Sequence, residues 1–228
     1  MNSTDSKQEE FVLYEVWDSL TRLLHWLNAF CVLFLSILGG ILYFRAGLKL
    51  SNPTIDTFVT IHVYVGYILA AGIILRWIWL FMGPPLSTLK DIIPATKEQM
   101  KTAKQTLLFY LRGFRGEPPF YVGHNPLAGF AYMTFFVVSA LQIIIGLMLN
   151  QVPPLPSGVR EPPYILIMGH DIGFYVILVY ILMHLSALII HELVESRSII
   201  SSMIHGKKVF KKEEMGMVED YVNSLREE

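Results

Sequence analysis

A chain of 228 residues with 53% hydrophobic and only 16% charged residues is too apolar for a soluble domain, in which about a quarter of the residues carry charge. Its formal net charge is −1, and we expect no nucleic-acid partner. The single cysteine, Cys31, excludes an internal disulfide, a cysteine-ligated iron–sulfur cluster and covalent haem bound through a C-x-x-C-H motif. The composition therefore predicts an integral membrane protein in contact with lipid.

The segment of residues 1–18 is polar and acidic. It has no basic stretch ahead of a short apolar run and no small-residue cleavage site, so the first apolar span is expected to be retained. Asp18 or Ser19 is predicted to cap the first helix, because both side chains can accept hydrogen bonds from its open backbone N–H groups.

Four stretches are apolar over the roughly 20 residues that a helix needs to cross a bilayer. Lipid offers an open backbone no hydrogen-bond partner, so each stretch is expected to be an α-helix. We predict an all-α membrane protein, a single domain over residues 1–228, in which four transmembrane helices form a bundle. The predicted spans are Leu23 to Phe44, Phe58 to Met82, Pro126 to Leu149 and Tyr164 to Ile190.

Basic residues are concentrated in the connection of residues 83–125 and in the tail of residues 191–228. Because cytoplasmic loops carry an excess of lysine and arginine, both termini and this connection are predicted to be cytoplasmic. Residues 96–111 of the connection are expected to form an amphipathic helix on the membrane surface. The only basic residues in the other two connections are Arg45, Lys49 and Arg160.

Two histidines lie fourteen residues apart in the fourth span, His170 and His184. This spacing is just under four helical turns, which places both on nearly one face and about 21 Å apart along the axis. That is too far for one metal site, but it suits two sites near opposite faces of an apolar layer about 30 Å thick. Because successive spans cross the membrane in opposite directions, His62 of the second span lies at the same outer depth as His170. His25 of the first span lies at the same inner depth as His184.

Two histidine pairs at two depths favour iron bound in porphyrin, because neutral imidazole is a strong iron ligand and helix bundles build cofactor sites from facing side chains. With a histidine on each side, the iron has no open position, so such a site transfers electrons and binds no substrate. Arg22 and Arg76 are candidates to neutralise haem propionates or to contact quinone. Small residues one turn beyond each histidine would let a porphyrin approach the backbone: Ala29, Gly66, Gly173 and Ala187.

Other interpretations of these residues stay open. Any one membrane histidine can instead hydrogen-bond a neighbouring helix. His191 lies seven residues beyond His184 and is its rival as the inner ligand, although its position near Glu192 favours an interfacial place. For His124 a loop or capping role is expected. Arg76 either faces the bundle interior or extends to the interface.

Several stretches resemble the b-type cytochrome subunit of membrane-bound nickel–iron hydrogenases, within a wider group that includes the cytochrome subunits of formate dehydrogenase. They run from about Tyr14 to Lys212. The Arg-x-x-His-Trp element belongs to the wider group, whereas the Gly-His-Asn-Pro-Leu-Ala and tail elements resemble the hydrogenase branch. The matching stretches are RLLHWLNA at 22–29, VGHNPLA at 122–128, GHDIG at 169–173 with His184, and SRSIISSMIHG at 196–206.

The resemblance implies a four-helix bundle that holds two b haems, one ligated by His62 and His170 and the other by His25 and His184. It implies a subunit in the bacterial or archaeal cytoplasmic membrane that does not itself activate hydrogen. Electrons would come from the iron–sulfur small subunit, which is bound with the nickel–iron large subunit on the periplasmic side, and would pass to quinone near the cytoplasmic surface.

Two further functions remain in view. The same bundle can serve a formate dehydrogenase or a thiosulfate or polysulfide reductase, where only the catalytic partner differs. From another class, the chain can be a haem-free membrane anchor or a histidine-lined transporter. A transporter would be expected to carry acidic residues inside the spans or broken helices at mid-membrane. The predicted spans hold no acidic residue except Asp171, near the outer end.

Overall fold

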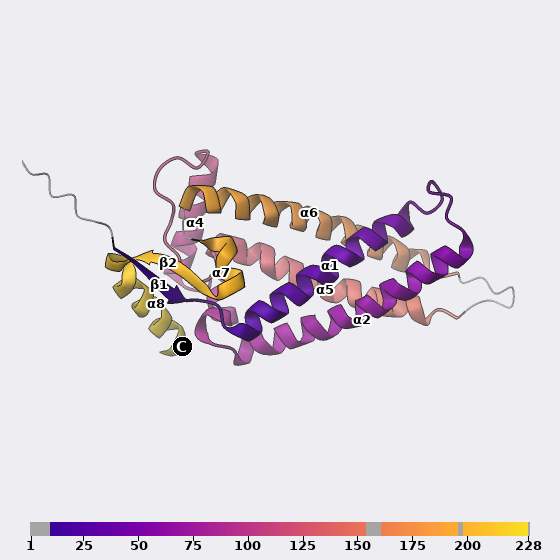
Figure 1. Ribbon diagram of the computed structural model, residues 1–228, viewed down its shortest axis with the longest axis horizontal. Coiled ribbons are helices and arrows are strands. Elements are labelled where there is room, and N and C mark those ends of the chain that lie inside the picture. The colour runs from indigo at the N-terminus through magenta and orange to yellow at the C-terminus, as the bar shows by residue number, and fades with distance from the viewer. Residues whose placement is uncertain (1–9, 154–160, 196–197, 228) are drawn as a thin grey trace, which may run out of the picture. The chain divides into compact units, whose positions relative to one another are not determined.

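The computed structural model describes residues 10–153, 161–195 and 198–227, and four long helices dominate it (Figure 1). All four are long and apolar enough to cross a membrane. They confirm the predicted all-α membrane fold, and they contain the predicted spans in full apart from Phe44. The helices are α1 (Ser19–Tyr43), α2 (Asn52–Met82), α5 (Pro126–Gln151) and α6 (Tyr164–Glu195).

All four of these helices extend beyond the apolar stretches, because a helix keeps its backbone hydrogen bonds where it leaves the hydrocarbon. Asp18 caps α1 as predicted: its Oδ1 accepts the backbone N–H groups of Leu20 and Thr21, each at 3.0 Å. The helix α2 begins six residues before the predicted span, at Asn52, and α6 continues to Glu195.

The chain divides into two compact units. The first, which we call the helical unit, comprises residues 23–79 and 130–186. The second, the mixed unit, comprises the described residues of 1–22, 80–129 and 187–228. The single domain expected over residues 1–228 stays a prediction.

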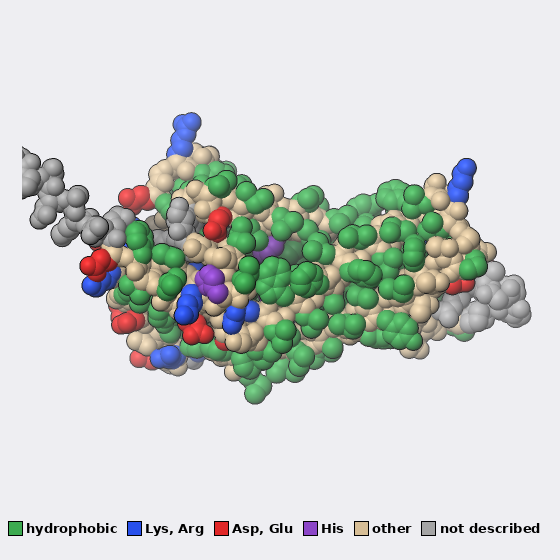
Figure 2. Space-filling model, in the orientation of Figure 1, with side chains coloured by type: hydrophobic (Ala, Val, Ile, Leu, Met, Phe, Trp, Pro, Cys, Tyr) green, Lys and Arg blue, Asp and Glu red, His purple; other side chains and the backbone are tan. Residues whose placement is uncertain are grey.

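The helical unit has a small core and a large apolar surface. Its buried core contains Cys31, Val32, Leu69 and Ile73. Apolar side chains elsewhere on the same helices are exposed, and Figure 2 shows hydrophobic side chains covering the visible face of the long helices. Exposed apolar surface of this extent is typical of a surface that a bilayer covers.

The mixed unit contains a two-stranded antiparallel sheet that sequence analysis did not predict. Strand β1 (Phe11–Glu15) pairs with β2 (Lys207–Lys211), so that Phe11 faces Lys211 and Glu15 faces Lys207. The pairing joins the N-terminal segment to the tail.

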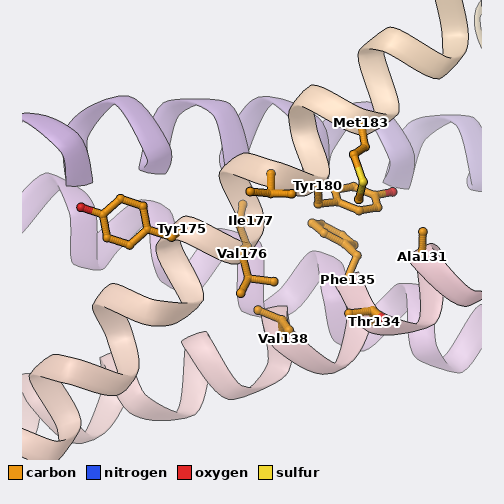
Figure 3. Close-up of a pocket in the computed structure, with 10 residues that line it drawn as sticks. Ala131, Thr134, Phe135, Val138, Tyr175, Val176, Ile177, Tyr180 and Met183 are labelled. Carbon is orange, nitrogen blue, oxygen red and sulfur yellow. The ribbon is translucent and has the colours of Figure 1, made fainter.

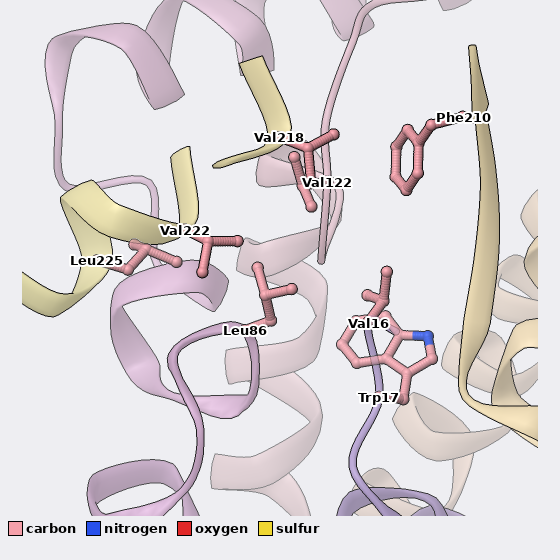
Figure 4. Close-up of a cluster of buried hydrophobic side chains, with 8 residues drawn as sticks. All are labelled: Val16, Trp17, Leu86, Val122, Phe210, Val218, Val222 and Leu225. Atoms are coloured by element: carbon pink, nitrogen blue, oxygen red, sulfur yellow. The ribbon is translucent and has the colours of Figure 1, made fainter. Parts of the chain in front are cut away.

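The mixed unit has a hydrophobic core of its own, to which α8, a strand and two loop segments contribute (Figure 4). In α8 (Met215–Glu227), Val218, Val222 and Leu225 follow helical spacing and bury one face. The remaining elements are η1 (Pro85–Ser87), α3 (Leu89–Ile92), α4 (Lys97–Leu111), α7 (Ile199–His205) and η2 (Lys212–Glu214). The core consists of Val16, Trp17, Leu86, Val122, Phe210, Val218, Val222 and Leu225.

The amphipathic helix expected over residues 96–111 is α4. Thr96 and Gln99 form a capping box at its start, in which each side chain accepts a hydrogen bond from the backbone N–H of the other residue. Its buried face is covered by protein, and its place on a membrane surface stays a prediction. The buried residues are Gln99, Ala103, Thr106 and Phe109.

Candidate haem-binding histidine pairs

The structure brings His62 and His170 together, as the depth argument predicted. His62 projects from α2 and His170 from α6, and their ring centroids lie 6.2 Å apart with the ring planes at 69°. We call these residues the outer pair, because sequence analysis assigns them to the outer end of the bundle.

The second predicted pair also forms. His25 of α1 and His184 of α6 have ring centroids 6.4 Å apart and ring planes at 49°. We call these residues the inner pair. The fourteen-residue spacing along one helix, seen in the sequence, therefore supplies one member of each pair.

The spacing of both pairs fits one metal atom between two imidazoles. An imidazole nitrogen binds a metal at about 2 Å and the ring centre lies roughly 1 Å behind that nitrogen, so two imidazoles on opposite sides of one metal have centroids about 6 Å apart. The observed 6.2 and 6.4 Å agree with this arrangement. Two neutral imidazoles are also a donor set that suits haem iron.

Glycines flank the outer pair. A Cβ added to Gly39 of α1 would lie 3.6 Å from Cε1 of His62, and one added to Gly146 of α5 would lie 3.5 Å from Cε1 of His170. Around Gly66, one turn beyond His62, a Cβ would meet nothing within 4 Å. The backbone is thus open beside His62, as the small-residue argument expected for a porphyrin.

The Nδ1 nitrogens of the outer pair have no hydrogen-bond partner among the described residues. The Nδ1 atoms of His62 and His170 are both buried. The alternative use of a membrane histidine, as a hydrogen-bond partner of a neighbouring helix, is therefore not observed at these two atoms.

Aromatic rings surround the inner pair. The ring of Tyr180 stacks on His184 with a centroid distance of 5.7 Å and an angle of 9°, and Tyr132 lies 6.5 Å from the same ring. On the other side, Trp26 meets His25 edge to face at 5.2 Å. These rings present polarizable, apolar surface to the two imidazoles.

An apolar groove of about 340 Å³ runs between α5 and α6 (Figure 3). Phe135 and Tyr180 stack in it with ring centroids 4.5 Å apart. Through Tyr180 the groove is linked to His184. Its lining suits an acyl or isoprenoid chain and offers little to a polar substrate.

The two arginines singled out in the sequence lie in different environments. Arg76 is only 6% exposed, so it takes the interior alternative and does not extend to an interface. Arg22 belongs to the mixed unit, where its terminal nitrogens donate to the carbonyl of Ile204 and to Oγ of Ser19. Contact of either arginine with a propionate or with quinone stays a prediction.

The rival ligand His191 is engaged elsewhere. Its Nε2, the atom that would bind iron, is hydrogen-bonded to the hydroxyl of Tyr110, and Asn125 donates to the same hydroxyl at 3.4 Å. His191 is therefore part of a buried polar cluster of the mixed unit. Glu192 accepts the backbone N–H of Ile200 at 2.9 Å.

His124 is held in a network that sequence analysis missed. Its Nδ1 and its backbone N–H both donate to Oδ2 of Asp91, at 2.6 and 2.9 Å, and Tyr221 donates to Oδ1 at 2.9 Å. Burial, followed by the charge of Asp91, raises the pKa of the Tyr221 hydroxyl above its ordinary value. The loop role expected for His124 agrees with this geometry.

A buried lysine fixes the same loop. Lys208 of β2 donates from Nζ to the carbonyls of Val122 and Gly123, at 2.9 and 2.7 Å, and lies over the rings of Trp17 and Tyr121. Nothing in the local sequence distinguishes Asp91 or Lys208 from the exposed charges around them. Only the tertiary fold reveals their burial.

Known proteins resemble this chain in sequence over the part that holds the histidine pairs. A family model described as prokaryotic cytochrome b561 matches residues 16–206. These residues include both histidine pairs and the whole of the four long helices.

Individual relatives are similar over most of their length. A probable Ni/Fe-hydrogenase B-type cytochrome subunit of Bradyrhizobium diazoefficiens is 27% identical over 212 residues, which cover 86% of each chain. One of Rhizobium leguminosarum bv. viciae is 28% identical over 220 residues, covering 87% of this chain and 90% of the relative. A probable Ni/Fe-hydrogenase 1 B-type cytochrome subunit of Escherichia coli K12 is 24% identical over 231 residues, covering 90% and 94%.

Proposed function

The chain belongs to the prokaryotic cytochrome b561 family, and from this we propose that it is the di-haem cytochrome b subunit of a nickel–iron hydrogenase. In this role it anchors the catalytic subunits at the cytoplasmic membrane and passes their electrons to quinone. The names of its relatives support the assignment. The single observation that carries it is the presence of two histidine pairs, each spaced for one iron atom.

The four histidines are the proposed haem ligands. His62 and His170 would hold one haem b, and His25 and His184 would hold the other. When bound, haem b supplies a one-electron ferric–ferrous couple. The helix α6 carries one ligand of each site about 21 Å apart along its axis and so sets the separation of the two sites.

The outer pair receives electrons first. The positive-inside distribution of lysine and arginine puts both termini in the cytoplasm and the outer pair near the periplasmic face. The partners, an iron–sulfur small subunit and a nickel–iron large subunit, then bind on the periplasmic side. Hydrogen oxidation there releases two electrons and two protons per molecule, and a haem held by the outer pair would be the nearer of the two to this electron source.

Quinone accepts the electrons at the cytoplasmic end. Each quinone takes up two electrons and two protons to become quinol, so proton-handling side chains are needed beside the inner pair. Within the helical unit Arg76 is the candidate to contact quinone, and Arg22 and Arg76 are candidates to neutralise propionates. The buried state of Arg76 supports its place among them.

A reduced-minus-oxidised visible spectrum, combined with haem determination as pyridine haemochrome, tests the proposal. We expect about two noncovalent, low-spin b haems per polypeptide. A folded preparation with no haem would contradict the proposal and leave the haem-free anchor or the transporter as the better interpretation.

Co-purification identifies the catalytic partner. We expect hydrogenase subunits to remain bound to the chain in mild detergent, and hydrogen gas to reduce both haems of the complex. Recovery of a formate dehydrogenase or of a thiosulfate or polysulfide reductase would keep the electron-transfer role and change its electron donor.

A further inference from the structure

Gln142 makes a direct contact with the ligand-bearing segment of α6. The side chain projects from α5, and its Nε2 donates to the backbone carbonyl oxygen of His170 at 2.8 Å. The acceptor is the peptide group of a candidate iron ligand. This bond fixes α5 against α6 at the height of that ligand.

Gly173 provides the space for this contact. A Cβ added at Gly173 would lie 2.5 Å from Cδ, 2.6 Å from Oε1 and 2.9 Å from Nε2 of Gln142, all closer than a real Cβ allows. The expected role of Gly173, to let a porphyrin approach the helix, is therefore corrected. The absence of its side chain accommodates the Gln142 amide.

The same face of α5 passes beside the His170 ring one turn further along. Gly146 follows Gln142 by four residues, and a Cβ there would meet Cε1 of His170 at 3.5 Å. The helix α5 thus bonds the backbone of His170 through Gln142 and leaves room beside its ring at Gly146. The hydrogen bond from Gln142 restricts the height of the ligand-bearing segment.

The amide oxygen of Gln142 differs from its nitrogen in having no hydrogen-bond partner within the described part of the chain. Oε1 of Gln142 is buried and has no hydrogen-bond partner among the described residues. A buried acceptor without a partner is unfavourable, so the amide is stabilised in place by its donor alone. A leucine of similar size would fill the same volume without this penalty, but it would not hold the carbonyl of His170.

We propose that Gln142, seated against Gly173, is a positioning residue that sets the orientation of His170 toward His62. This inference rests on the proposed haem function of the outer pair. Groups behind a metal ligand fix its orientation and its strength as a ligand, and their loss typically changes metal affinity 10- to 100-fold. The inner pair has no contact with Gln142 that the structure records, so the effect should be confined to the outer haem.

The test compares Gln142→Leu and Gln142→Asn with the wild-type protein by redox titration and electron paramagnetic resonance of both haems. The asparagine variant keeps the amide but withdraws it by one methylene from the carbonyl. In both variants we expect the oxidation equilibrium of one haem to shift about tenfold, which is about 59 mV for a one-electron couple. The g-values of that haem should shift as well, while those of the other haem stay unchanged.

Gly173→Ala supplies an independent test that leaves Gln142 in place. Its new methyl group should displace the amide and reproduce the effect of Gln142→Leu. In a Gln142→Ala background the methyl has room, so adding Gly173→Ala should cause no further shift. Thr134→Val is the matched control, because Thr134 lies on the same helix and its hydroxyl donates to the carbonyl of Phe130 in its own helix.

The outcomes separate this inference from the proposed function. A wild-type protein without two low-spin haems would contradict the proposed function itself. Two haems in the wild type with unchanged potentials and g-values in Gln142→Leu would overturn the positioning role alone. Loss of both haems from Gln142→Asn would assign Gln142 to general folding and also overturn it, whereas selective change or loss of one haem supports it.

Discussion

The two units of this protein treat their buried polar groups in opposite ways. In the mixed unit, Asp91 accepts three hydrogen bonds and Lys208 donates two. In the helical unit, Nδ1 of His62, Nδ1 of His170 and Oε1 of Gln142 are buried without a hydrogen-bond partner among the described residues. The difference indicates that the polar groups of the mixed unit stabilise a fold, and it supports the proposal that the two histidines of the helical unit serve a site.

The contrast is strong but has an exception. Among the described residues of the mixed unit, Nε of Arg22 is also buried without a partner. Buried polar groups are usually satisfied, so those that are not are the first place to look for function. Substitutions in the two units should then have different consequences, namely loss of cofactor in one and loss of stability in the other.

The largest effect is expected from the histidine pairs. Replacing His62 or His184 by alanine should lower the haem content from about two to about one per polypeptide, because the haem of that pair loses one of its two histidine ligands. The helix content measured by circular dichroism should stay close to wild type, since no hydrogen bond of the fold is lost. Pyridine haemochrome measures the outcome.

His191→Ala is the control for the inner pair. Its Nε2 is bonded to Tyr110, so this variant should retain both haems. If His191→Ala lost one haem while His184→Ala kept two, the assignment of the inner pair would be wrong.

In the mixed unit, the largest effect is expected from Lys208→Met. Methionine fills a similar volume but leaves the carbonyls of Val122 and Gly123 buried without a donor, which should lower the local free energy of opening by about 3 kcal/mol. Haem content should not change. Hydrogen exchange of the β2 amides in the full-length protein in detergent measures the opening free energy.

The neighbouring lysine of β2 offers a matched comparison. Lys207 is exposed, and Lys207→Met should change the opening free energy by less than about 0.5 kcal/mol. Equal protection of the β2 amides in the two variants would mean that the buried contacts of Lys208 do not stabilise the unit.

A smaller effect is expected from Asp91→Asn. The amide has one acceptor oxygen where the carboxylate has two, so one of the groups donated by His124 and Tyr221 loses its partner. The charge-assisted bonds are also weakened, and we expect a loss of about 2 kcal/mol. Hydrogen exchange of the α8 amides measures it, with the exposed Asp220→Asn as the control. An equal loss of opening free energy in Asp220→Asn would show that the buried hydrogen bonds of Asp91 are not the cause.

The two units also differ in how far their structure could be predicted. The four helices follow from apolar length alone, and the histidine pairs follow from a fourteen-residue spacing and alternating helix directions. The mixed unit has no comparable signal, because β1 and β2 are each five residues long and lie almost the whole chain apart. Pairing at such a separation depends on the tertiary core around Trp17 and Phe210.

Prediction from local patterns failed most clearly where one residue type can have two structural roles. A glycine one turn beyond a histidine makes room for any neighbour, and the sequence does not say which. At Gly66 the space is open, whereas at Gly173 it holds Gln142. Asp91 likewise follows a lysine in a charged connection, and only the fold shows that it is buried.

The smallest effect is expected from Tyr221→Phe. The Tyr221 hydroxyl donates to Asp91 and accepts from Gln99 at 3.3 Å, so its loss should lower the free energy of unfolding of the mixed unit by about 1 kcal/mol at neutral pH. Urea titration of the full-length protein, followed by the fluorescence of the buried Trp17, measures this change.

The pH dependence of the same variant tests the cause of the shift. Burial and then the charge of Asp91 raise the folded-state pKa of Tyr221, whereas an unfolded tyrosine loses its proton near about pH 10. The stabilisation is therefore complete below about pH 10 and falls as the pH rises above it, because the unfolded state then binds fewer protons than the folded state. Tyr221→Phe should lack this alkaline decrease, and an equally steep decrease in the variant would show that another group causes it.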